Sequence, residues 1–122
     1  MQTMHDDLHF DFEVCRLAAQ LPNAKLVFST DATAGAHGRN AEEFIGCVEH
    51  CGQTPMAALV SANQVAAEAL DMADRLGRLA PGNQADIIAL DGDPLQDMTA
   101  VRRVAFVMRG GVVYKWTGSA LP

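Results

Sequence analysis

Residues 76–94 read LGRLAPGNQADIIALDGDP, and this stretch decides the fold class. Glycine and proline turns enclose one apolar run, ADIIAL at 85–90, which predicts a short strand. Two more apolar runs follow at 104–116, in VAFVMRGGVVYKW. The Gly110-Gly111 pair between them predicts a tight hairpin, because glycine adopts positive φ at little cost. The part of the chain after residue 75 is therefore expected to be mostly β.

The part before it is expected to alternate helix and strand. Residues 11–21, DFEVCRLAAQL, place apolar side chains at helical spacing, and Pro22 ends that helix. KLVFST at 25–30 is a short apolar run that predicts a buried strand. The short connection between the two is typical of an α/β unit.

Two further helical stretches follow. Asn40 is expected to cap the first, with Glu43 three residues on completing a pattern that resembles a capping box. Thr54 is expected to cap the second, which begins at a proline, and residues 55–70 are rich in alanine. This second stretch predicts either one helix or two helices with a break near Asn63.

Composition excludes several classes of protein. The chain has 122 residues, 49% of them apolar, and a net charge of −6. A nucleic-acid partner requires a basic face, which this charge disfavours. No apolar run approaches the roughly 20 residues that cross a bilayer. Three cysteines cannot all pair within one chain, so no disulfide framework is expected and a reducing cytoplasm is the predicted location.

The stretch FSTDATAGAHGRN at 28–40 holds the candidate site. Asp31 closes the predicted strand, and in α/β folds ligands bind at the carboxyl ends of strands. A carboxylate there either caps a turn or binds a metal and accepts a proton. His37 and Gly38, with Arg39 beside them, either form a polar pocket for an anionic group or lie in a solvated loop.

Other histidines and cysteines carry weaker signals. Cys47 and Cys51 lie one helical turn apart with His50 nearby, but both cysteines share an apolar stripe, which favours burial over metal binding. His5 and His9 lie four residues apart without the glutamate of an H-E-x-x-H zinc motif. They are expected to be exposed near a terminus.

Three stretches together resemble the C-terminal portion of the amidohydrolase superfamily, especially its imidazolonepropionase-like and dipeptidase-like metal-dependent hydrolases. Residues 28–44 are similar to the last barrel strand and its loop, residues 52–70 to the helices that follow, and residues 76–114 to the return into a small β-sandwich. The third stretch is the most specific, through Gly77, Leu79, Gly82, Ala85, Asp86 and the DGDPL turn at 91–95.

The resemblance implies an α/β fold: the last strand and helices of a (β/α)8 barrel in residues 1–75, then the C-terminal part of a β-sandwich in residues 76–122. It implies that Asp31 binds a catalytic divalent metal, with zinc expected, and acts as general base on water. It further implies that His37 and Gly38 line the pocket of a small-molecule or peptide-like amide substrate.

The sequence departs from that family in one respect. The resemblance calls for a His-x-His pair on the first barrel strand and more histidines on middle strands, and this sequence supplies neither. We therefore expect a fragment that is inactive alone and that pairs with a missing barrel portion or forms a homo-oligomer through its exposed strand edges. The alternative is a non-catalytic α/β interaction module that self-associates through those edges.

Overall fold

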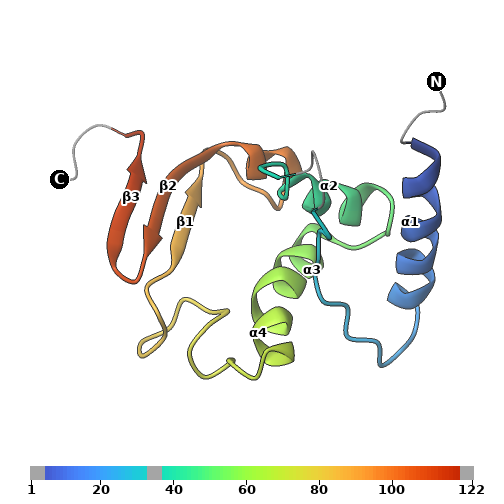
Figure 1. The fold of residues 1–122 in the computed structure, drawn as a ribbon, viewed down its shortest axis with the longest axis horizontal. Helices are drawn as coiled ribbons and strands as arrows, with labels where there is room; N and C mark the ends of the chain where they lie inside the picture. Colours follow the sequence, from blue (N-terminus) through green and yellow to red (C-terminus); the bar gives the residue numbers. More distant parts are fainter. Residues whose placement is uncertain (1–4, 33–36, 119–122) are drawn as a thin grey trace.

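The structure is a computed structural model that describes residues 5–32 and 37–118, with side chains from residue 12 onward. The three-stranded sheet lies at one end of the molecule, α1 at the other, and α2 to α4 between them (Figure 1). No helix of the described residues is long and apolar enough to cross a membrane. The elements are α1 (His5–Ala19), α2 (Glu42–Glu49), α3 (Pro55–Val60), η1 (Ser61–Val65), α4 (Ala66–Ala69), β1 (Ile87–Leu90), η2 (Met98–Arg102), β2 (Val104–Arg109) and β3 (Val112–Trp116).

The predicted β-rich part is confirmed. The sheet is antiparallel in the order β1-β2-β3, and Gly110 and Gly111 form the hairpin turn with φ of 55° and 81°. The Gly110 N–H also donates a 2.7 Å hydrogen bond to the Asp86 carboxylate, which ties the start of β1 to the turn. The register shifts once in each ladder, between Ala89 and Leu90 in β1 and between residues 107 and 108 in β2.

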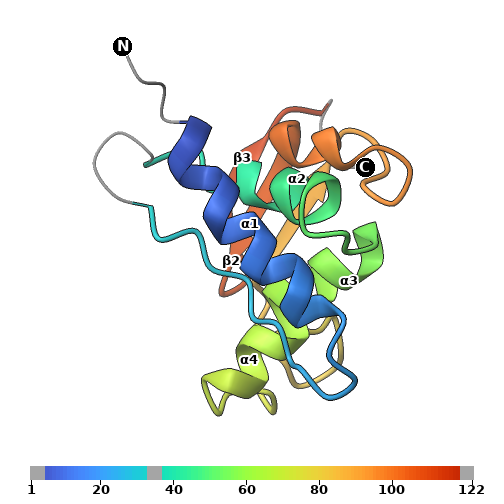
Figure 2. The same cartoon turned by 90° about the vertical axis from the view of Figure 1, so that its right-hand side faces the viewer.

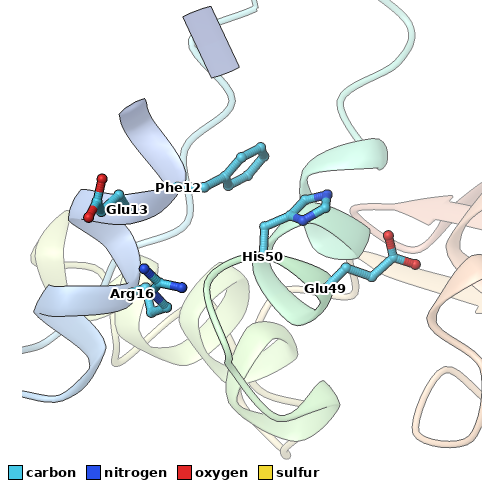
Figure 3. A pocket seen from close by; sticks show the side chains of 5 residues that line it. All are labelled: Phe12, Glu13, Arg16, Glu49 and His50. Carbon is cyan, nitrogen blue, oxygen red and sulfur yellow. The ribbon is translucent and has the colours of Figure 1, made fainter. Parts of the chain in front are cut away.

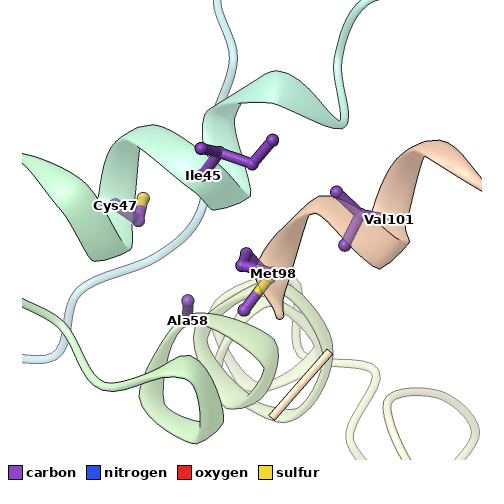
Figure 4. Close-up of a cluster of buried hydrophobic side chains, with 5 residues drawn as sticks. All are labelled: Ile45, Cys47, Ala58, Met98 and Val101. Atoms are coloured by element: carbon purple, nitrogen blue, oxygen red, sulfur yellow. The ribbon is translucent and has the colours of Figure 1, made fainter. Parts of the chain in front are cut away.

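The buried core lies where α2, α3 and η2 meet (Figure 4), and Leu90 at the end of β1 packs against it. A bidentate ion pair at its rim joins α2 to η2, with Arg102 Nε donating to Glu42 Oε1 at 2.8 Å. The hydrogen bonds from this guanidinium lower the pKa of the Glu42 carboxyl. The core side chains are Ile45, Cys47, Ala58, Met98 and Val101.

The predicted cap of the second helical stretch is confirmed, since the Thr54 hydroxyl accepts a 3.2 Å hydrogen bond from the Ala57 N–H. The helical run then continues through Asn63 without a break. It widens into a π-helical turn, η1, between α3 and α4. Two side chains bond to earlier carbonyls there, Ser61 to Ala58 and Asn63 to Leu59, both at 2.8 Å. These bonds help the helix accommodate the wider turn.

The predicted capping box at Asn40 is wrong. Helix α2 begins at Glu42 after Ala41, with no side-chain cap. The Asn40 amide instead donates a 3.2 Å hydrogen bond to the Thr30 hydroxyl, so it is engaged with the preceding segment rather than with the helix.

The predicted strand at 25–30 is also wrong, because the segment belongs to no sheet. Its backbone bonds to the rest of the molecule through the Phe28 N–H and the Ser61 carbonyl at 3.4 Å. A strand requires a neighbour with which to form a ladder, and the described part of the chain provides none for this segment.

The expectation of unpaired cysteines is corrected as well. Cys15 of α1 forms a disulfide with Cys51, just after α2, and Cys47 remains a buried free thiol. The two paired residues lie 36 apart in sequence, so no local pattern indicates the pair. The packing of α1 beside the end of α2 brings their Cα atoms to 5.4 Å.

Candidate functional site

Asp31 lies just beyond a segment anchored at two points. The Phe28 ring stacks on Phe44 of α2 with centroids 4.3 Å apart, at the edge of the core. Two residues on, the Thr30 hydroxyl accepts the hydrogen bond from Asn40. This hydrogen bond links Thr30, just before Asp31, to Asn40, just after the segment that holds His37 and Gly38. The two ends of the loop that carries Asp31 are thereby held together.

The backbone at Asp31 adopts a left-handed conformation with φ of 38°. Among the described non-glycine residues, it shares a positive φ only with Asp71. Aspartate tolerates this region better than most residues, but it remains uncommon and often marks a functional position. The side chain is exposed and makes no hydrogen bond or ion pair to another described residue.

His37 and Gly38 lie on the returning arm of the same loop, and both are exposed. No ion pair joins His37 to Asp31. The structure thus brings the three predicted site residues onto one loop, while their roles stay predictions.

The residues described do not make a metal site by themselves. No group of three or more His, Cys, Asp or Glu side chains among them is placed to hold an ion. Cys51 is in the disulfide, Cys47 points into the core, and His50 packs on Phe12. The side chains of His5 and His9 lie outside the described residues.

Two concave surfaces lie elsewhere. A groove of about 990 Å³ runs between the sheet and the α3–η1 helical run, and it is mostly apolar. A smaller pocket of about 290 Å³ lies between α1 and the end of α2, lined by Phe12, Glu13, Arg16, Glu49 and His50 (Figure 3). Neither is lined by Asp31 or His37. No local sequence pattern indicates the groove or the pocket, because both form between segments that are distant in sequence.

The match to known proteins covers most of the chain. Residues 8–114 match the Amidohydrolase family, and the chain belongs to that family. The ochratoxinase of Aspergillus niger is 33% identical over 97 residues, which are 76% of this chain and 20% of that protein. The resemblance seen in the sequence is therefore confirmed.

Solved structures agree with this assignment. A Xaa-Pro dipeptidase with bound methionine in its active site superposes with a TM-score of 0.80 and 35% identity, over 85% of this chain and 25% of the dipeptidase. The A. niger ochratoxinase structure superposes with a TM-score of 0.75 and 29% identity, over 89% of this chain and 25% of that chain. The chain thus spans about a fifth to a quarter of the length of these relatives.

Proposed function

We propose that this chain forms the C-terminal part of a metal-dependent hydrolase that cleaves C–N amide bonds. The proposal rests on Asp31, an exposed residue with a left-handed backbone, within the region that matches the amidohydrolase family. The loop that carries it is closed at its ends by the hydrogen bond between Asn40 and Thr30. Residues 1–75 would belong to the barrel and residues 76–122 to a β-sandwich. The cytoplasm remains the expected location.

The names of the relatives indicate the substrate class. One is a Xaa-Pro dipeptidase and another an ochratoxinase. We therefore propose a small-molecule or peptide-like amide as the substrate, with His37 and Gly38 lining its pocket. Their position on the loop that carries Asp31 supports this role.

Asp31 would accept the proton from the attacking water, since a carboxylate near a polarised water can act as a general base. It would also be one ligand of a divalent ion, with zinc expected. A catalytic zinc needs about three protein ligands, and the described residues do not supply them. The remaining ligands must come from a polypeptide that completes the barrel, so we expect this chain to be inactive alone.

A chimera tests the proposal. Residues 8–114 replace the matched quarter of the Xaa-Pro dipeptidase, and the metal content and hydrolysis of an Xaa-Pro dipeptide are measured. We expect the chimera to bind metal and hydrolyse the dipeptide, and the 122-residue chain alone to do neither. A folded, metal-loaded chimera without amide hydrolysis would contradict the proposed function. Stoichiometric zinc in the isolated chain would contradict the incomplete site.

A second candidate, a self-associating interaction module, is favoured by the sheet. β1 and β3 are both edge strands, and every residue of β3 is exposed. Ile88, Val112 and Tyr114 expose 60%, 58% and 70% of their surface. Apolar strand edges of this kind are templates for pairing with another chain.

We expect the isolated chain to be a dimer or larger at micromolar concentration in size-exclusion chromatography with light scattering. Val112→Lys combined with Tyr114→Lys should shift it toward monomer, because charges on an edge strand oppose pairing. Met56→Lys is the matched control: Met56 is also exposed but lies on α3, away from the sheet edges. A monomeric wild-type chain would count against self-association.

A further inference from the structure

Among the residues whose side chains are described, from residue 12 onward, α1 contacts α2 near the end of that helix, and the two helices lie side by side (Figures 1 and 2). The Phe12 ring packs against His50 with centroids 4.7 Å apart (Figure 3). It also lies over Gly46, where an added Cβ would approach Phe12 Cε1 to 2.9 Å. One turn along α1, Cys15 forms the disulfide with Cys51. These contacts join one face of α1 to α2.

Several apolar side chains in and just after the described part of α1, from residue 12 onward, are exposed. Val14 and Leu17 expose 53% and 57% of their surface, and Leu21 just after the helix exposes 62%. A helix of 15 residues is marginal in water without tertiary packing. Because these apolar side chains remain exposed to water, the disulfide is an important restraint on the part of α1 from residue 12 onward.

The two cysteines of the disulfide differ in their exposure to solvent. Cys51 is 2% exposed, whereas Cys15 is only partly buried. The pocket of about 290 Å³ is lined by their neighbours in sequence, Arg16 and His50, and by neither cysteine itself. Because Cys15 is the less buried of the two, we expect a small thiol to attack the disulfide at the Cys15 sulfur.

The third cysteine does not compete for the pair. Cys47 points into the core beside Ile45, Ala58 and Met98 (Figure 4). Burial raises the pKa of its thiol, and only the thiolate attacks a disulfide. We therefore expect Cys47 to react more slowly than the Cys15–Cys51 pair.

We propose that Cys15 and Cys51 form a redox-sensitive clasp that holds α1 against α2 when oxidised and releases it when reduced. A dithiol reductant attacks the Cys15 sulfur, and the Cys51 sulfur leaves as a thiol after protonation. The second thiol of the reductant then releases Cys15 and closes the reductant into a cyclic disulfide. Two electrons and two protons pass to the protein, and the reductant is oxidised.

Release of α1 has a consequence for the segment that follows it. Residues 20–30 connect α1 to the loop that carries Asp31, and their described links to the body include the Phe28 hydrogen bond and an ion pair between Lys25 and Glu68. Loss of the clasp would leave the start of this segment without a fixed point. The inference concerns the position of α1 and holds whether or not the proposed hydrolase function is correct.

The first test counts thiols. The intact 122-residue chain is denatured with and without a dithiol reductant, alkylated and weighed. We expect one modified cysteine in the oxidised protein, which is Cys47, and three after reduction. Three modified cysteines in protein kept under a low-molecular-weight disulfide oxidant would overturn the proposal.

The second test measures hydrogen exchange of the folded chain. On reduction, amides of residues 12–19 should exchange about tenfold faster or more, while those of β2 keep their rates. Cys15→Ser should match the reduced protein under both conditions, and Cys47→Ala should respond to reductant like the wild type. Unchanged exchange in α1 of the wild type would contradict the clasp. An equal loss of protection in β2 would mean that the disulfide stabilises the whole fold rather than the position of α1.

Discussion

Replacement of Asp31 by asparagine is expected to lower the hydrolysis rate of the completed enzyme, such as the dipeptidase chimera, by about 1,000-fold. The substitution removes the charge that would accept a proton and bind the ion, while it keeps the size of the side chain. Asparagine also tolerates the left-handed backbone at this position, where φ is 38°. The loss should therefore appear in kcat/KM without a change in the unfolding midpoint.

Asp71 provides the matched control for this substitution. It is the other described non-glycine residue with positive φ, at 56°, and it too is exposed. We expect Asp71→Asn to leave hydrolysis unchanged, because this residue lies after α4, outside the loop that carries Asp31. Retention of most of the activity by the Asp31 variant would rule out its role as ligand and base.

Gly77→Ala is expected to destabilise the chain by about 3 kcal/mol. Gly77 has a φ of 85°, which disfavours any side chain. It also lies against the helical run: an added Cβ would sit 2.7 Å from the carbonyl oxygen of Asn63 and 2.8 Å from the Cβ of Ala67. Neither atom is the end of a flexible side chain, so helix or loop must move. Urea unfolding followed by circular dichroism measures the change.

Gly82→Ala separates the cost of the positive φ from the cost of the steric contact that an added Cβ makes at Gly77. Gly82 has a similar φ of 92°, but an added Cβ would meet no heavy atom within 4 Å. This variant should lose only the backbone contribution, about 1 kcal/mol. Equal losses in the two variants would mean that the contact between Gly77 and the helical run does not stabilise the fold.

The sequence predicted those parts of the fold that are governed by local rules. The hairpin at Gly110 and the cap at Thr54 follow from the conformations that glycine and threonine adopt, and both are confirmed. The strand at 25–30 failed because an apolar pattern does not supply the neighbouring strand that a ladder needs, and no residue of this segment is fully buried. The capping box failed because Asn40 had a competing partner in Thr30, which no local pattern reveals.

The candidate site likewise has features that the sequence predicts and features that only the three-dimensional structure reveals. The resemblance pointed to Asp31 through its place in a motif, and the family assignment is confirmed. The left-handed backbone of Asp31 and the hydrogen bond that closes its loop are visible only in three dimensions. The disulfide was missed because its cysteines are far apart in sequence, and a count of three cysteines does not say which two meet.

The register shifts in the sheet bear on how far an assembly of this chain could grow. Each ladder carries one, near Leu90 and near Met108. Irregularities of this kind strengthen the local twist of a sheet, and a strongly twisted edge cannot be extended repeatedly by copies of itself. Pairing through β1 or β3 would therefore favour a closed particle of few subunits over an open fibre. The register shifts near Leu90 and Met108 would therefore oppose amyloid-like growth of the sheet.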